Sequence, residues 1–489
     1  MRRMLALLCA ILMLTSVVAC GKAEPADTTT ATTVPATDGT TSATIPAETE
    51  PPKAFDSVEA ENLGGEFHIY YSQSDNAYED FHAETITGDI KNDLIYERNS
   101  MVEEKLGVDI QISWTAYGNV NTECQNQVRS GSADYDLFGG HRASLALSYQ
   151  GMQYDLSDIS TLQLDQEWWD QGYIDAITVN DQLYTVIGEL GVSTLLFVSS
   201  MTFNKRLMDE ANIAYPYDLV REGKWTLDAL FNMTTDYSAD LNGDGKLVPA
   251  DDRYALLGWE GESAFSLFYA SGFSFINRNA AGEPVLEYDM DKLNSVLKKV
   301  TDIWLRDNVY ITTGGTAEHA ATYGMFAAER ALFSDIVLSK IGTFYSDMED
   351  DFGIVPSPKF DEEQKKYCAH LGYTIPVLFM SSNVADPERN GTIMEALCTA
   401  SYDHVTPQMY EIVTKLKNAR DEDSSEMIEI IIRNKFIDTA HFFDIEGYGT
   451  LPRTIIANKN PNSVSMIKTF ERIAAKEWEK IIDGFDKLG

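Results

Sequence analysis

The sequence is poor in positive charge. It has 38 Lys and Arg against 76 Asp and Glu in 489 residues, so its formal net charge is −38. A surface with such an excess of carboxylates repels phosphate backbones, which argues against nucleic-acid binding. The first 53 residues contribute only −1 of this charge. The acidity therefore belongs to the chain that follows them.

Long apolar runs and cysteines are also scarce. Only the first twenty residues form a long apolar run, which excludes a polytopic membrane protein. Beyond that run and Cys20, the remaining cysteines are Cys124, Cys368 and Cys398, with no C-x-x-C motif. At most one disulfide is possible, and we expect buried free thiols.

The common enzyme signatures are missing. The chain has no H-E-x-x-H, no G-x-S-x-G and no phosphate-binding P-loop, and its 7 His are scattered without a pair at metal-ligand spacing. Paired carboxylates for glycoside hydrolysis stay open, because 76 acids always offer pairs. The sequence favours a protein that is not an enzyme.

The first residues have the order of a secretory signal. Arg2-Arg3 precede an apolar stretch that ends near Val18, and Ala19-Cys20 follow. This order predicts a signal peptide over residues 1–19. A Cys directly after a small residue resembles a bacterial lipobox, in which Cys20 becomes the lipidated N-terminus; the alternative is an ordinary signal peptide with a Cys nearby. Lipidation would place the protein on the extracellular face of the cytoplasmic membrane, held by acyl chains alone.

Residues 20–53 are rich in Thr, Pro and Ala, and Val34 and Ile45 are the only large apolar residues after Cys20. Such a segment cannot bury enough surface to offset the entropy of ordering it. We expect a disordered tether that holds a folded body away from the membrane.

The rest of the chain predicts an α/β fold. Residues 65–71 have strand character, residues 89–106 carry apolar residues at helical spacing up to Gly107, and residues 108–112 alternate like a strand. This strand-helix-strand order predicts a parallel sheet. The length exceeds what one hydrophobic core supports, so two lobes are expected. Further strands are expected at 135–138, 182–187, 195–198 and 352–358, and helices at 125–130, 201–211, 293–305, 392–399, 408–417, 425–434 and 464–488.

One acidic loop has the spacing of a calcium site. Counted from Asp240, oxygen ligands fall at positions 1, 3, 5 and 12, Gly is at position 6, and position 7 offers a backbone carbonyl. The alternative is a solvated acidic turn. We expect a structural Ca²⁺, with Asp252 as a substitute for the last ligand. The expected ligands are Asp240, Asn242, Asp244, Lys246 and Asp251.

Several aromatic residues lie beside turns or strand ends: Trp168, Trp169, Trp225, Trp259 and Tyr373. Trp and Tyr faces pack on the C–H surfaces of sugar rings. The alternative for each is packing in the core, as large aromatics are mostly buried. Trp169 and Trp259 are the candidates for stacking on a ligand.

Polar residues follow two predicted strands. Gly139-Gly140-His141-Arg142 end the strand at 135–138, and Glu189 follows the strand at 182–187. Open α/β sheets bind ligands at the carboxyl ends of their strands. His141, Arg142 and Glu189 are therefore candidate ligand-binding residues, and the alternative is a plain turn with a surface Arg.

With these residues in view, the chain resembles the extracellular solute-binding proteins of ABC importers, in the sugar-binding branch that includes maltose-binding protein. The landmarks, besides the lipobox, the tether and the acidic loop, are DLIYERN at 93–99, YDL at 135–137, WWD at 168–170, FNK at 203–205, GKWTLD at 223–228, MFAAERALF at 325–333 and GIVPSPK at 353–359.

The resemblance implies a two-lobed clamp whose chain crosses between the lobes several times and closes on a ligand by hinge motion. It implies a first lobe of 56–187 plus 374–425 and a second of 190–372 plus 426–489. It supports His141, Arg142 and Glu189 as ligand contacts. The further residues that it nominates are Ser334, Asp335, Tyr373, Tyr448 and Arg453.

The function that follows is delivery of a carbohydrate, expected to be an oligosaccharide, to the permease subunits of an ABC transporter by a monomeric protein without catalysis. Two alternatives stay open. One is a lipid-anchored secreted glycoside hydrolase, and the other is a calcium-dependent surface glycan-binding protein.

Overall fold

The computed structural model describes residues 53–73, 78–116, 118–313, 315–372, 374–414, 422–459 and 464–489. The expected signal peptide, Cys20 and nearly all of the expected tether lie outside this part, as does Tyr373. Among the described residues, no helix is both long and apolar enough to cross a bilayer.

Four strands form the first sheet, in the order β12-β3-β1-β2. β1 runs parallel to β2 and β3, whereas β12 is antiparallel to β3. Phe67, Ile69 and Tyr71 of β1 are buried on one face of the sheet, and Tyr70 and Phe138 pack together on the other. The strands are β1 (Glu66–Gln73), β2 (Asp109–Ala116), β3 (Leu137–Gly140) and β12 (Val377–Phe379).

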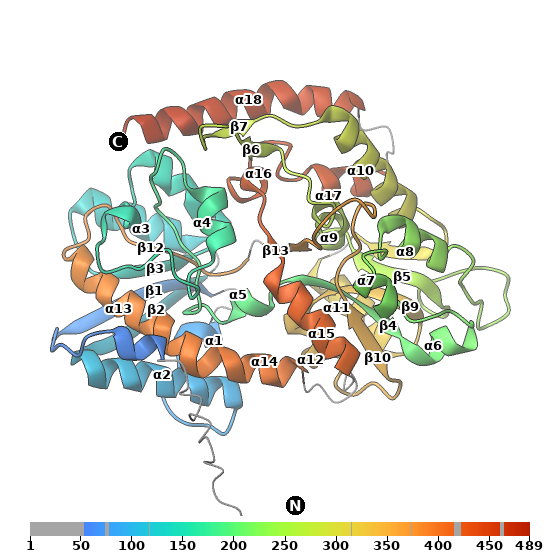
Figure 1. The fold of residues 1–489 in the computed structure, drawn as a ribbon, viewed down its shortest axis with the longest axis horizontal. Helices are drawn as coiled ribbons and strands as arrows, with labels where there is room; N and C mark the ends of the chain where they lie inside the picture. Colours follow the sequence, from blue (N-terminus) through green and yellow to red (C-terminus); the bar gives the residue numbers. More distant parts are fainter. Residues whose placement is uncertain are drawn as a thin grey trace, which may run out of the picture. The chain divides into compact units, whose positions relative to one another are not determined.

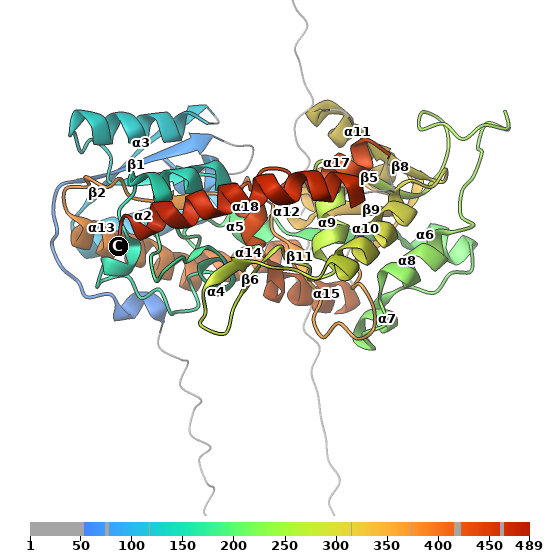
Figure 2. The same ribbon diagram turned by 90° about the horizontal axis from the view of Figure 1, so that it is seen from above.

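Helices cover both faces of this sheet. α2 (Ile90–Leu106) and α13 (Pro387–Ala400) lie on one side and α3 (Asn119–Ser130) on the other (Figure 2). α2 begins where the Asp89 carboxylate accepts a hydrogen bond from the Asn92 N–H at 2.9 Å, and it ends at Gly107, whose φ is 62°. The predicted strand-helix-strand unit is confirmed, with its helix bounded by the predicted residues.

Five strands form the second sheet, in the order β10-β4-β9-β5-β8. β5 is parallel to β8 and β9, and β4 is antiparallel to both of its neighbours. β4 and β9 are buried along their whole lengths because helices pack on both faces. The strands are β4 (Ser199–Asn204), β5 (Tyr254–Trp259), β8 (Val309–Thr312), β9 (Ala331–Val337) and β10 (Phe352–Val355).

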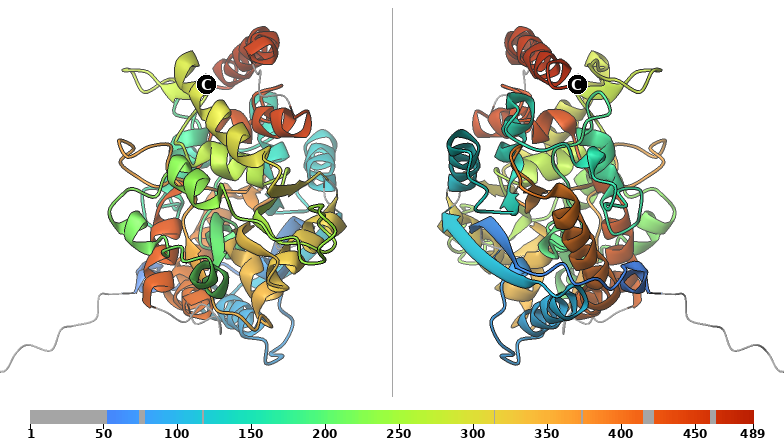
Figure 3. Two further views of the ribbon diagram at one scale, coloured as in Figure 1. Left: turned by 90° about the vertical axis from the view of Figure 1, so that its right-hand side faces the viewer. Right: turned by 90° about the vertical axis from the view of Figure 1, so that its left-hand side faces the viewer.

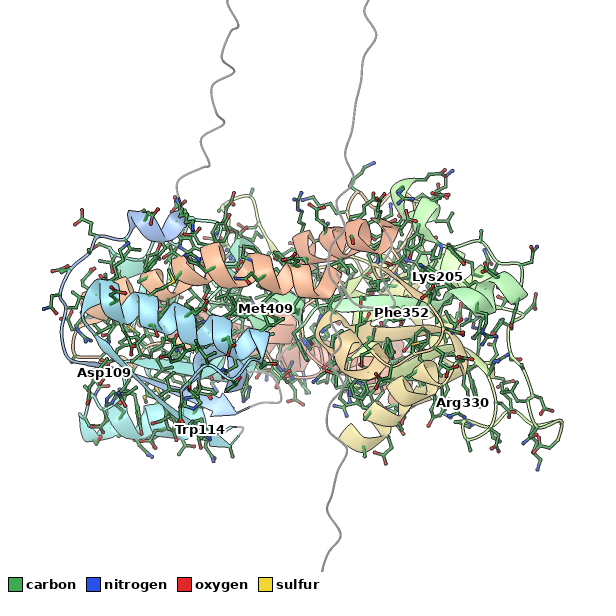
Figure 4. The ribbon with its side chains drawn as sticks, turned by 90° about the horizontal axis from the view of Figure 1, so that it is seen from below. Asp109, Trp114, Lys205, Arg330, Phe352 and Met409 are labelled. Atoms are coloured by element: carbon green, nitrogen blue, oxygen red, sulfur yellow. The ribbon has the colours of Figure 1, made fainter. Side chains whose placement is uncertain are left out.

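The helices of this half are α6 (Lys205–Glu210), α7 (Tyr217–Arg221), α8 (Leu227–Thr234), α9 (Ser263–Tyr269), α10 (Met290–Trp304), α11 (Thr316–Ala327) and α12 (Leu338–Tyr345). Trp225 and Trp304 lie in its core, at 0% and 1% exposure. Figure 4, in which Trp114 marks β2 and Phe352 marks β10, shows Met409 between the two halves.

Three predicted elements differ in the structure. Residues 182–187 form only isolated bridges, and residues 195–198 overlap the short helix α5 (Ser193–Leu196). The helix predicted over 201–211 starts only at Lys205, because β4 occupies the residues before it. A strand buried on both faces shows no alternation, so its apolar residues resemble a helical pattern.

A buried polar network fixes the chain where it leaves the first half. Arg98, which is 1% exposed, donates to the Leu190 carbonyl at 3.1 Å and to the Ser401 hydroxyl at 3.2 Å. Both oxygens of Asp80 accept from the Ser193 N–H, at 3.1 and 3.0 Å. Residues 190–193 are therefore bonded to the first half before β4 begins.

The crossing segments also include two small sheets and a bulged helix. β11 (Ala369–His370) pairs with β13 (Lys435–Phe436), and the hairpin of β6 (Ile276–Arg278) and β7 (Pro284–Leu286) extends from the second half. The remaining elements here are the π-helical turn η4 (Ser401–Val405), α14 (Thr406–Thr414), α15 (Glu422–Arg433), α16 (Thr439–Phe442) and α17 (Leu451–Ala457). The predicted lobe boundaries stay a prediction.

The helix α18 (Val464–Asp486) lies across both halves (Figures 1 and 3). Near its start, Phe470 lies against Gly447, where an added Cβ would come within 2.2 Å of the ring. Near its end, an added Cβ on Gly484 would come within 2.7 Å of Tyr149, and Gln182 donates to the Phe485 carbonyl at 3.2 Å. Two glycines thus permit two close contacts, one with each half.

The three cysteines of the body are free, as predicted. Cys124 and Cys398 are buried, and Cys368 is half-buried.

Candidate functional site

Polar residues meet at the carboxyl ends of strands from both sheets. His141 and Arg142 follow β3, at the start of the 3₁₀ helix η2 (Arg142–Gln150), while Glu260 and Glu262 follow β5. Asp335 lies near the end of β9, which is parallel to β5. This is the place where open α/β sheets bind ligands.

Arg142 reaches from the first half to the segment around α16. Its guanidinium donates to the His441 carbonyl at 2.8 Å and lies 3.1 Å from the Asp444 carboxylate. The Arg142 side chain is 13% exposed. The Arg142 guanidinium therefore binds a carbonyl and a carboxylate at once.

Three buried acids lie after β5 and near the end of β9, and the charge of Arg142 acts on one of them, Glu262. Glu260, Glu262 and Asp335 are 6%, 9% and 4% exposed. Asp335 accepts a hydrogen bond from the Ser266 hydroxyl at 2.6 Å. One oxygen of Glu260 and one of Glu262, the Oε2 atom in each, have no hydrogen-bond partner among the described residues. We call Glu260, Glu262 and Asp335 the acid cluster.

Burial raises the pKa values of Glu262 and Asp335. Burial first, and then the negative charge of Asp335, raises the pKa of Glu262 to about 8, although the positive charges of Arg142 and Arg453 oppose the shift. Burial also raises the pKa of Asp335 to about 6, against the hydrogen bonds from Ser266 and Ser263. The acids share too little positive charge to be ionised cheaply.

Arg453 and Trp259 complete the site. Arg453, on α17, approaches Glu260 at 3.4 Å with a side chain that is 45% exposed. Trp259, the last residue of β5, is half-buried and stacks on His319 of α11, with ring centroids 4.3 Å apart. Gly261 is required beside it, since a Cβ there would come within 2.4 Å of the indole.

Two neutral histidines back the site. His370 of β11 and His441 of α16 have ring centroids 5.2 Å apart, and both rings pack on Phe265 of α9. Burial and then the charge of Arg142 lower the pKa of His370 to about 3, and the same causes lower the pKa of His441 well below its usual value. Neither ring can supply a positive charge at neutral pH.

Four predicted site residues therefore come together: Arg142, Trp259, Asp335 and Arg453. His141 is next to them, but its ring accepts a hydrogen bond from the Ala143 N–H at 3.2 Å and caps η2. Burial lowers the pKa of His141 to about 4.

Glu189 and Trp169 lie in a separate group at the crossing segments. The Glu189 carboxylate accepts a hydrogen bond from the Thr406 hydroxyl, and burial raises its pKa to about 7. The Trp169 indole is 1% exposed and donates to Glu395 at 3.0 Å. Because its whole side chain packs inside the first half, Trp169 has no face open for a sugar.

Tyr448 and Ser334 are also core residues. Tyr448 is 0% exposed, stacks on Phe275 at 4.4 Å and shares a hydrogen bond with the Tyr288 hydroxyl at 2.5 Å. Ser334 is 0% exposed and accepts from the Tyr345 hydroxyl at 3.1 Å. The candidate Tyr373 lies outside the described residues.

Sequence reasoning missed Glu260 and Glu262. They follow β5 directly, so the rule that nominated Arg142 after β3 applies to them as well. The signal for them is the apolar run at 254–258 ahead of Trp259, which marks the strand that they follow. His319 carried no sequence signal, because its contact with Trp259 arises only in the tertiary structure.

The acidic loop folds as a series of tight turns. Asp240 accepts from the Gly243 and Gly245 N–H groups at 2.6 and 2.7 Å, and Asn242 accepts from the Asp244 N–H at 2.9 Å. Asp252, not the exposed Asp251, closes the loop. Its carboxylate accepts from the Leu241 and Val248 N–H groups at 2.9 and 2.7 Å. Within the described ranges, no three His, Cys, Asp or Glu side chains converge as a metal site.

A cavity of about 560 Å³ lies away from the acid cluster, between α4 (Gln171–Ile177) and the β6–β7 hairpin. Arg278 donates to the Asp175 carbonyl at 3.0 Å and to the Thr178 carbonyl at 2.7 Å. The Arg278 side chain is therefore held by carbonyls at the C-terminal end of α4.

The structure is similar to solved solute-binding proteins. A cyclo/maltodextrin-binding protein complexed with maltotetraose has a TM-score of 0.54 at 13% identity, covering 84% of this chain and 97% of its own. An ABC substrate-binding protein from Listeria monocytogenes in complex with cycloalternan scores 0.53 at 12% identity, over 85% and 99%. The extracellular solute-binding protein from Staphylococcus aureus in complex with maltose scores 0.52 at 12% identity, over 86% and 98%.

No protein-family model and no curated protein matches the sequence. The structural similarity nevertheless confirms the predicted resemblance and the two-lobed α/β fold class. At such low identity it establishes the fold alone.

The pKa of Glu262 predicts how stability depends on pH. An unfolded Glu loses its proton near pH 4.5, whereas folded Glu262 keeps it to about pH 8. The folded state thus binds more protons in this window, so the free energy of unfolding falls as pH rises through it. In Glu262→Gln this fall is absent, because glutamine does not titrate. We expect the difference in free energy of unfolding, variant minus wild type, to rise by ~2–4 kcal/mol between pH 4.5 and pH 8.

Urea unfolding across this pH range measures the effect. Glu479→Gln, at an exposed position of α18, is the matched control and should follow the wild type. Parallel pH profiles for all three proteins would show that burial of Glu262 has no energetic consequence.

Proposed function

We propose that this protein is a carbohydrate-binding solute-binding protein that delivers its ligand to an ABC permease by closure of its two halves. The observation that carries the proposal is the pair of buried, unpartnered carboxylate oxygens of Glu260 and Glu262. They lie beside Trp259 at the end of β5, and the charge of Arg142 acts on Glu262 from the other half.

This chemistry suits a polyhydroxylated ligand. Sugar hydroxyls donate hydrogen bonds to carboxylates, and an indole packs against the C–H face of a sugar ring. A buried oxygen without a partner loses free energy that a ligand donor restores. Because the site draws on both halves, bound ligand would favour their closed arrangement.

The acid cluster also favours a second candidate function, glycoside hydrolysis. Buried carboxyls with raised pKa values serve as general acids in such enzymes. A hydrolase would release shorter saccharides, whereas a binding protein would return its ligand intact.

We also propose that the acidic loop holds a structural Ca²⁺ through Asp240, Asn242, Asp244, the Lys246 carbonyl and Asp251. Each side-chain oxygen that accepts one loop N–H keeps a second lone pair for a cation. Asp252 would brace the loop from behind. A lipid on Cys20, outside the described residues, would hold the protein at the membrane.

We expect calorimetry against a panel of saccharides to show binding of at least one without product formation. Trp259→Ala should weaken that binding about threefold to tenfold, because a stacking face is lost. Trp114→Ala, an exposed indole on β2, is the control and should bind normally. A flat response to every saccharide would refute carbohydrate binding, and product formation would favour the hydrolase.

Chelation by EGTA should lower the melting temperature by ~2–5 °C, since an ion bound only to the folded state stabilises it. Asp240→Asn should abolish this difference, and Asp307→Asn, at an exposed position outside the loop, should preserve it. Equal melting temperatures with and without chelator would favour a plain acidic turn.

Cys20→Ser should move the protein from the membrane fraction to the medium, because acyl chains would be its only anchor. Cys9→Ser, in the same leader, is the control and should stay with the membrane. Release of both variants, or of neither, would argue against lipidation at Cys20.

A further inference from the structure

The acid cluster has more negative charge than its surroundings neutralise. Arg142 is already paired with Asp444 at 3.1 Å and donates to the His441 carbonyl at 2.8 Å. Arg453 is nearer to Glu260, at 3.4 Å, and is 45% exposed to solvent. Both arginines therefore divide their positive charge between Glu262 and a second acid, which is Asp444 for Arg142 and Glu260 for Arg453.

The neighbouring histidines do not make up the difference. Burial lowers the pKa of His370 to about 3 and of His319 to about 4, and it lowers the pKa of His441 well below its usual value. The groups whose charges act on Glu262 are Asp335 from β9, Arg142 from η2 and Arg453 from α17. Two of these three charges are positive, but Arg142 also pairs with Asp444 and Arg453 with Glu260, so two arginines are set against four acids.

Asp335 and Glu262 differ in how their oxygens are satisfied. Asp335 accepts hydrogen bonds from the Ser266 and Ser263 hydroxyls, so the protein itself supplies it with two donors. Glu262 is 9% exposed, and its Oε2 atom has no partner. Glu262 is thus the acid of this pair that has a buried oxygen without a hydrogen-bond donor.

A neutral hydroxyl would supply Glu262 with a hydrogen bond but no charge. A protonated amine supplies both, and removal of a carboxylate from water costs least when a cation accompanies it. A metal ion is the weaker alternative, because no three metal-binding side chains converge within the described ranges.

We propose that the ligand carries a positively charged amino group, which binds against Glu262 in the acid cluster. This rests on the proposed function, and it narrows the ligand class from saccharides in general to basic, amine-bearing ones. Asp335 adds negative charge behind Glu262, and Trp259 packs against the apolar face of the same ligand.

The test compares ligands that differ only at one position of the sugar. Glucosamine oligomers carry the amine, N-acetylglucosamine oligomers carry a neutral amide, and glucose oligomers of the same linkage carry a hydroxyl. We expect the glucosamine oligomer to bind the wild type ~10-fold or more tightly than the other two. Spermidine is included as a cation without a sugar.

Two measurements connect any preference to Glu262. Glu262→Gln should lose the preference for the amine and bind the charged and neutral oligomers with similar affinity, whereas Glu479→Gln should keep the preference. In calorimetry at pH 7 in two buffers of different ionisation enthalpy, amine binding should release a proton from the wild type. Burial raises the pKa of Glu262 to about 8, so its carboxyl holds that proton until the ammonium group displaces it.

The outcomes separate the two proposals. Tighter binding of neutral oligomers than of glucosamine oligomers, without proton release, overturns the amine and leaves carbohydrate binding intact. Binding of spermidine but of no saccharide keeps the amine and overturns carbohydrate binding. No binding of any probe counts against both. If Glu262→Gln fails to fold, the affinities of the wild type for the three oligomers and its proton release on binding still test the amine proposal.

Discussion

A buried carboxylate must be given hydrogen-bond donors or a cation, and this requirement organises the molecule. Asp80 is supplied by Ser193 and Lys91, and Glu395 by two indole N–H groups. Both acids join segments distant in the sequence, so each one fixes part of the fold. Glu260 and Glu262 are equally buried but keep an oxygen without a donor. The same requirement thus separates acids that hold the structure from the two acids to which the proposed function assigns a ligand.

Local features of the fold could be predicted, because they depend on neighbours in the sequence. The helix over 90–106 is bounded by Asp89 and Gly107, both visible in the chain. The strand at Ser199–Asn204 overlaps the helix expected over 201–211, since burial on both faces removes the alternation that marks a strand. Burial on two faces is a tertiary property, so the sequence alone does not reveal it.

The site was only partly predictable for the same reason. Arg142 could be found from its place after a strand. Trp169 and Tyr448 also lie beside turns, but whether such a ring faces the core or a ligand depends on what packs over it. Glu262 stands out only when Asp335, Arg142 and their partners are counted together, and these come from separate segments.

The contacts of α18 limit how the two halves can move. The helix packs on Gly447 near its start and on Tyr149 near its end, and both contacts are too close to admit even a methyl group. A helix of this kind is a stiff rod, so it cannot lengthen as the halves separate. Any opening must either detach one end of α18 or turn the halves about an axis close to the helix. The second kind of motion keeps both contacts. The two halves would then rotate about an axis close to α18, and the largest displacement would occur at the points farthest from this helix.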